Sequence, residues 1–110
     1  MDKNTTKVLL IEKDANDARV FQKMFRQLNQ NSRKFHLDII DRLDEALAQV
    51  SNHHIDTLLI DDCMLNGRPA KMPAQLEKLT SGIPIIVLSS EPAECSNFKI
   101  GMYDYLSKNA

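Results

Sequence analysis

Three short apolar runs, each ending abruptly at polar side chains, constrain the fold of this chain more than any other feature. They are residues 7–11 before Glu12-Lys13-Asp14, residues 57–60 before Asp61-Asp62, and residues 84–88 before Ser89-Ser90. Apolar runs of this length that do not alternate with polar residues are typical of strands buried on both faces. Such strands occur in parallel sheets that helices cover on both sides.

The segments between these runs have the spacing of helices and of two further strands. From Asp17 onward one apolar stripe is predicted for a helix, made of Val20, Phe21, Met24, Phe25 and Leu28. A second helix is expected to start at Asp41 or Arg42, and weaker helical patterns cover 73–79 and 93–100. Residues 36–40 and 103–106 read as strands. Alternating strands and helices predict a doubly wound α/β domain.

Composition narrows the classes of function. A chain of 110 residues has room for one domain, and 14 basic against 15 acidic side chains give a net charge of -1, so no nucleic-acid partner is expected. No apolar run is long enough to span a membrane, and the polar start lacks a secretion signal. A cytoplasmic protein is therefore expected. Cys63 and Cys95 have neither zinc-site nor disulfide-framework spacing.

The polar residues after the strands form the candidate site. In an open parallel sheet the functional crevice lies at the carboxyl ends of the strands, where Glu12, Asp61, Ser89 and Lys108 are expected to converge. Carboxylates a few ångströms apart repel by roughly 4 kcal/mol per pair at an effective dielectric near 20, so they need a cation or a proton. Mg²⁺ suits such oxygen ligands, and a lysine and a hydroxyl suit phosphoryl oxygens.

Four segments in this order resemble the receiver domains of response regulators in two-component signalling. They are "VLLIEKDANDA", "HIDTLLIDDCML", "IPIIVLSS" and "GMYDYLSK". The resemblance implies a flavodoxin-like fold with five parallel strands in the order 2-1-3-4-5. It also implies one receiver domain over residues 1–110, expected to be the N-terminal part of a larger signalling protein.

The resemblance assigns the phosphoryl and metal chemistry to particular residues. It implies that Asp61 accepts a phosphoryl group from a sensor histidine kinase or a phosphotransfer protein. Glu12, Asp61 and the backbone carbonyl of Cys63 would be the Mg²⁺ ligands. Lys108 would pair with the phosphoryl group.

A conformational switch is implied as well. Ser89 would be the hydroxyl that senses the phosphoryl group, and Tyr105 the aromatic residue that rotates inward with it. The movement would remodel the surface that a downstream output domain reads.

Two features depart from the family pattern. The family usually has two adjacent acids after the first strand, and Lys13 stands at the position of the second one here. Asp14 would compensate for the lost acid if the loop turned its side chain inward. Two mechanisms therefore stay open: a phosphorylated switch, or a phosphorylation-independent docking or dimerisation module in which Lys13 and Lys108 neutralise the acids. The family's last helix has no counterpart before Ala110, so one sheet face is expected to lack its cover and to drive self-association.

An enzyme is not expected. The glycines Gly67, Gly82 and Gly101 do not form a phosphate-binding loop. No histidine follows a strand where it would activate Ser89 or Cys63 as a nucleophile.

Overall fold

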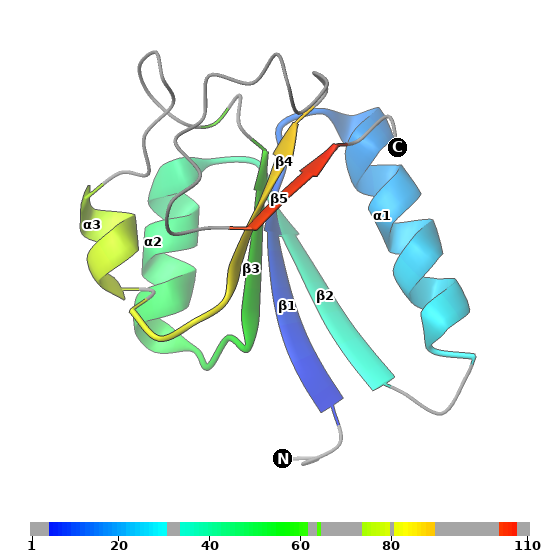
Figure 1. Ribbon diagram of the computed structural model, residues 1–110, viewed down its shortest axis with the longest axis horizontal. Coiled ribbons are helices and arrows are strands. Elements are labelled where there is room, and N and C mark those ends of the chain that lie inside the picture. Colours follow the sequence, from blue (N-terminus) through cyan, green and yellow to red (C-terminus); the bar gives the residue numbers. More distant parts are fainter. Residues whose placement is uncertain are drawn as a thin grey trace.

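The computed structural model describes residues 5–30, 34–61, 64, 74–79, 81–89 and 104–107. These residues form a five-stranded sheet in the order β2-β1-β3-β4-β5, with every neighbouring pair parallel (Figure 1). In chain order the elements are β1 Thr5–Ile11, α1 Ala15–Leu28, β2 Lys34–Ile40, α2 Leu43–Asn52, β3 Thr57–Asp61, α3 Ala74–Leu79, β4 Ile85–Ser89 and β5 Asp104–Ser107. The predicted doubly wound α/β fold and strand order are confirmed.

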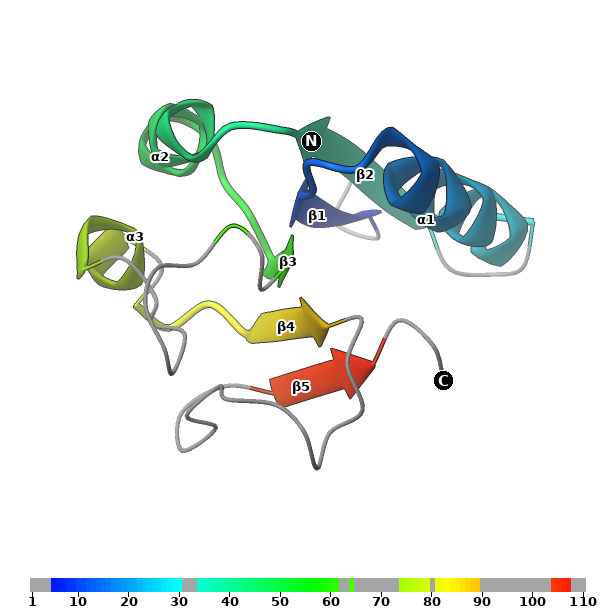
Figure 2. The ribbon, with the colours of Figure 1, turned by 90° about the horizontal axis from the view of Figure 1, so that it is seen from above.

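Helices cover the sheet on both sides. Seen from above, α2 and α3 lie on one side of the strands and α1 lies on the other (Figure 2). None of the described helices combines the length and the apolar content that crossing a membrane requires. The short helix expected within 93–100, and the question of a helix after β5, lie outside the described residues.

The continuous apolar runs supply two cores because successive side chains of a strand point to opposite faces. In β1, Leu9 and Ile11 join the core on the α2 and α3 side, whereas Val8 and Leu10 join the core on the α1 side. All four are at most 4% exposed. A strand buried on both faces therefore needs apolar residues at every position, as its sequence shows.

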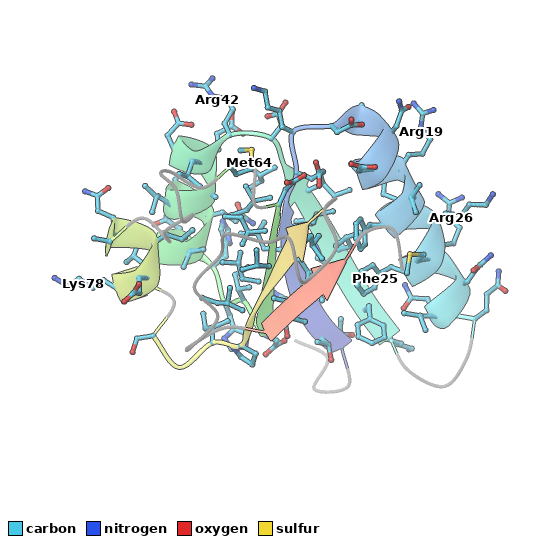
Figure 3. All side chains as sticks on the ribbon, turned by 45° about the horizontal axis from the view of Figure 1, so that its top comes forward. Arg19, Phe25, Arg26, Arg42, Met64 and Lys78 are labelled. Atoms are coloured by element: carbon cyan, nitrogen blue, oxygen red, sulfur yellow. The ribbon has the colours of Figure 1, made fainter. Side chains whose placement is uncertain are left out.

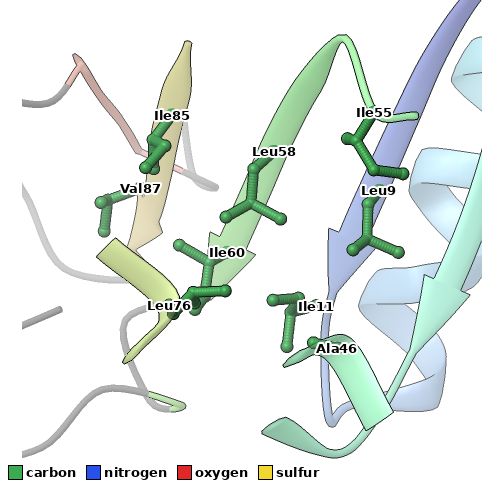
Figure 4. Packing of buried hydrophobic residues seen from close by; sticks show 9 residues of the cluster. All are labelled: Leu9, Ile11, Ala46, Ile55, Leu58, Ile60, Leu76, Ile85 and Val87. Atoms are coloured by element: carbon green, nitrogen blue, oxygen red, sulfur yellow. The ribbon is translucent and has the colours of Figure 1, made fainter. Parts of the chain in front are cut away.

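The larger core lies between the sheet and the helices α2 and α3. Figure 4 shows its buried side chains, which come from β1, α2, β3, α3, β4 and the loop before β3. They are Leu9, Ile11, Ala46, Ile55, Leu58, Ile60, Leu76, Ile85 and Val87. Leu58, Ile60, Leu76 and Val87 have no exposed surface. This core holds β3 in the middle of the sheet.

The second core is smaller, and α1 covers it only in part. Phe21 is buried, and the Phe25 ring packs edge to face on Phe35 of β2 with the ring centres 5.3 Å apart. Figure 3 shows Phe25 turned toward the sheet and Arg26 turned away from it.

The apolar stripe predicted for α1 divides into a buried half and an exposed half. Val20, Met24 and Leu28 remain 56%, 48% and 43% exposed, respectively. Helical periodicity places them on one stripe with Phe21 and Phe25, but their side chains remain largely exposed beside the buried Phe21. The exposed half is an apolar ridge along α1.

Polar side chains tie α1 to the strands on either side. Asp14 caps its N-terminus by accepting hydrogen bonds from the backbone N–H groups of Asn16 and Asp17. At the other end of the helix, the side-chain amide of Asn29 forms two hydrogen bonds with the backbone of Phe35. Its Oδ1 accepts from the Phe35 N–H at 2.6 Å, and its Nδ2 donates to the Phe35 carbonyl at 3.0 Å. The entry and exit of the helix are therefore fixed relative to β1 and β2.

Asp56 connects the loop before β3 to β1. The backbone N–H of Lys7 donates to Asp56 Oδ2 at 2.8 Å, and the His54 ring lies 2.7 Å from Asp56 Oδ1. The Lys7 hydrogen bond, followed by the His54 contact, lowers the pKa of Asp56 below its ordinary value. The charged carboxylate is therefore the form that stabilises this connection.

Truncation inside the larger core is expected to destabilise the fold. Leu58→Ala removes a side chain with no exposed surface and is expected to cost about 2 to 5 kcal/mol of the free energy of unfolding. Leu79→Ala makes the same chemical change at a residue that is 41% exposed, and should cost less than about 1 kcal/mol. Urea denaturation of both variants measures the difference, and equal losses would contradict this description of the core.

The pKa of Asp56 predicts a loss of stability in acid. A carboxyl group whose pKa is lowered by folding stabilises the protein above its unfolded pKa, and that contribution disappears as the pH falls through the folded pKa. The free energy of unfolding of the natural chain should therefore fall more steeply below the ordinary aspartate pKa of 3.8 than that of Asp56→Asn. Denaturation across this range measures both slopes, with Asp41→Asn as an exposed control; a slope unchanged by Asp56→Asn would refute the prediction.

Candidate functional site

The pairing of β1 with β3 brings two acidic side chains together. Ile11 of β1 is aligned with Ile60 of β3, so the residues that follow, Glu12 and Asp61, reach the same level at the carboxyl edge of the sheet. Glu12 is 2% exposed and Asp61 is 3% exposed. The Glu12 backbone N–H also donates to the carbonyl of Ile40 at 3.0 Å, which holds this residue in line with the strands.

The first turn of α1 adds a third carboxylate. The backbone N–H of Asp14 donates to Glu12 Oε1 at 3.1 Å, and the Asp14 side chain then caps the helix that begins at Ala15. This sharp turn from strand to helix returns half-buried Asp17 toward the strand ends. One carboxylate oxygen from each of Glu12, Asp17 and Asp61 lies within 4.8 Å of the others.

This group of three acids, Glu12, Asp17 and Asp61, fits a divalent cation by the chemistry of its donors. Two like charges about 4 Å apart repel by roughly 4 kcal/mol at an effective dielectric near 20, so a positive charge among them is strongly favoured. Mg²⁺ prefers oxygen ligands and usually binds through one or two carboxylates while it keeps several waters. Glu12 and Asp61 are buried and Asp17 is half-buried, so the group also has a side that solvent reaches.

The structure brings together two of the predicted site residues and adds one that the sequence did not suggest. Glu12 and Asp61 meet as expected. Asp14, which was expected to compensate for Lys13, is exposed and caps α1; Asp17 is the acid that approaches the other two. The spacing of Asp14 and Asp17 matches a helix cap and the third residue of its first turn, which is the one sequence feature that could have pointed to Asp17.

The remaining predicted site residues are described in part or not at all. The backbone of Ser89 ends β4 one position beyond Leu88, which pairs with Asp61, and Tyr105 of β5 pairs with Val87. Their side chains, and Cys63 and Lys108 entirely, lie outside the described residues.

Lys13 lies at the surface, in the turn between β1 and α1. Its side chain is exposed, and within the described part of the chain it forms no ion pair. It borders a hollow of about 400 Å³ that is also lined by Glu12, Ile40 and Asp41. No described residue of β3 lines this hollow.

Comparison with known sequences identifies the family. A sequence model described as the response regulator receiver domain matches residues 8–110, which is nearly the whole chain. No curated protein matches the chain at a significant level.

Solved structures with the same fold include receiver domains. The receiver domain of sensor histidine kinase PA1611 from Pseudomonas aeruginosa, solved with a magnesium ion in its active site cleft, has a TM-score of 0.71 at 18% identity over 96% of this chain and 87% of that chain. The N-terminal domain of a response regulator/sensory box/GGDEF protein from Carboxydothermus hydrogenoformans has a TM-score of 0.67 at 20% identity over 96% and 83%. The receiver domain of the Francisella response regulator 1452 has a TM-score of 0.61 at 22% identity, over 94% of this chain and 84% of that chain.

The family match and the shared fold agree. The family match covers the strands, the acids that follow them and the last described strand, and the neighbours share the arrangement of the sheet and helices. The chain therefore belongs to the response regulator receiver domain family and is a receiver domain of two-component signalling.

Proposed function

We propose that Asp61 accepts a phosphoryl group from a phosphohistidine on a sensor histidine kinase or a phosphotransfer protein. The observation that carries this proposal is the position of Asp61, which ends β3 at the carboxyl edge of the sheet and is 3% exposed beside Glu12. In the transfer a carboxylate oxygen of Asp61 bonds to phosphorus. The bond between phosphorus and the donor imidazole nitrogen breaks, and its electron pair stays on that nitrogen.

The same proposal gives Glu12 the role of a metal-binding acid. Glu12, Asp61 and the backbone carbonyl of Cys63 would hold Mg²⁺, which when bound offsets the negative charge of the phosphoryl oxygens. Glu12 is held in place by hydrogen bonds at its backbone and at Oε1. Its carboxylate is therefore positioned before a metal ion arrives.

The consequences of phosphorylation would be carried by the neighbouring strands. Ser89 would contact the phosphoryl group, Lys108 would pair with it, and Tyr105 would move inward with Ser89, which changes the surface that a downstream output domain binds. The domain would act in the cytoplasm as a signalling module rather than as an independent enzyme. Neither nucleic acid nor a membrane is proposed as a partner.

The rival function is a docking module that works without phosphorylation. It requires Lys13 and Lys108 to neutralise Glu12 and Asp61 in place of a metal ion. Lys13 is exposed and forms no ion pair within the described part of the chain, which favours the phosphorylated switch.

Phosphorylation at Asp61 can be tested with a small-molecule donor. With Mg²⁺ and acetyl phosphate, the natural chain is expected to gain one phosphoryl group by intact-mass spectrometry, and Asp61→Asn to gain none, because an amide is a far weaker nucleophile. Asp62→Asn is the matched control, since it removes the same charge from the adjacent residue, and it should still be modified. Labelling that persists in Asp61→Asn, or a natural chain that takes no phosphoryl group, would refute the assignment.

We also propose that two copies of the chain associate through α1. The ridge formed by Val20, Met24 and Leu28 is exposed and runs along one face of the helix at intervals of four residues. Ridges with this spacing pack into the grooves of a second helix. A second copy presents the same ridge, so a two-fold symmetric contact would cover both.

This association predicts a charge-sensitive dimer. Met24→Lys places a charge in the middle of the ridge and should lower the average mass toward that of a monomer. Gln22→Lys adds the same charge to an exposed position on another face of α1 and should leave the mass unchanged. Sedimentation equilibrium at micromolar concentration measures both; a natural chain that is monomeric under these conditions would disprove the contact.

A further inference from the structure

We propose that Asp17, in the first turn of α1, supplies the magnesium-site carboxylate that is missing at Lys13. This inference rests on the metal site of the proposed function and identifies its third acid in this chain. The observation behind it is that an Asp17 carboxylate oxygen lies within 4.8 Å of those of both Glu12 and Asp61. Asp17 comes from a different element from the residue it would replace.

The start of α1 explains how Asp17 reaches the site. The Asp14 side chain accepts hydrogen bonds from the backbone N–H groups of Asn16 at 2.8 Å and of Asp17 at 3.2 Å. Asp14 is itself bonded to Glu12 through its backbone N–H. The first turn of the helix is therefore attached to the end of β1, and Asp17 is held on the side of the strand ends.

The dimensions of the group suit magnesium. Octahedral Mg²⁺ with bonds near 2.1 Å places neighbouring ligand oxygens about 3 Å apart and opposite ones about 4.2 Å apart. Oxygens within 4.8 Å of one another can therefore contract around the ion through small rotations of the side chains. Because Asp17 is only half-buried, this part of the site keeps the water ligands and the access that magnesium needs.

The charges favour the same conclusion. A lysine in place of an acid changes the local charge by two units, which weakens cation binding if nothing compensates. Lys13 is exposed and borders the hollow that Glu12, Ile40 and Asp41 also line. Asp17 restores a negative charge next to Glu12 and Asp61, so the chain keeps three carboxylates around one position.

A magnesium titration without any phosphoryl donor tests this role. Isothermal titration calorimetry of the whole chain should show that Asp17→Asn raises the dissociation constant for Mg²⁺ roughly tenfold or more, because a charged ligand is lost. Asp14→Asn removes the same charge three residues away, and asparagine caps helices as well as aspartate does. This control should change the constant less than about threefold.

A rescue separates the loss of a ligand from a general disturbance. Adding Lys13→Asp to Asp17→Asn restores a third carboxylate, now at the position where the family usually has its second acid. The double variant should recover most of the lost Mg²⁺ affinity. Thermal unfolding without metal should remain cooperative in every variant. Equal dissociation constants for Asp17→Asn and Asp14→Asn, or a natural chain that binds no Mg²⁺ at millimolar concentration, would overturn the inference.

Failure of this inference and failure of the proposed function give different results. If Asp61 is phosphorylated while Asp17→Asn binds Mg²⁺ like the natural chain, the receiver function stands and Asp17 has no metal role. If Asp17→Asn alone weakens Mg²⁺ binding while Asp61 takes no phosphoryl group, the metal site stands without the phosphoryl transfer.

Discussion

The parallel register between β1 and β3 is the constraint on which the site depends. Because Ile11 is aligned with Ile60, the polar residues that follow them, Glu12 and Asp61, meet at one level of the sheet. The same register sends Leu9 and Ile11 to the larger core. A slip of one residue would exchange the two faces of β1 and would also separate Glu12 from Asp61. The core that stabilises the fold therefore also aligns the acids.

The site combines two opposing requirements, the burial of apolar strands and the burial of charged carboxylates. The apolar runs gain stability by burial, whereas Glu12 and Asp61 are almost as buried as the runs that precede them. Buried carboxylates are unfavourable unless cations or hydrogen bonds compensate them. The molecule places these buried carboxylates at the end of a well-packed sheet, where the pairing of the strands holds their positions.

Different parts of helix α1 make different contacts. Its capped first turn directs Asp17 to the strand ends, and its middle covers the smaller core through Phe21. Its outer side carries the exposed ridge of Val20, Met24 and Leu28. Since one helix carries these features, a partner that binds the ridge would touch the same element that brings Asp17 to Glu12 and Asp61.

The sequence alone determined the class of fold, the order of the elements and the meeting of Glu12 with Asp61. These depend on local polarity patterns and on the general rule that the ends of parallel strands share an edge. Only the tertiary structure decided that Asp17 rather than Asp14 joins the acids, and that Val20 is exposed while Phe21 is buried. Periodicity places residues on a face of their own helix. Which of them meets another element depends on the angle at which the helix leaves its strand, and that angle is set by capping and packing together.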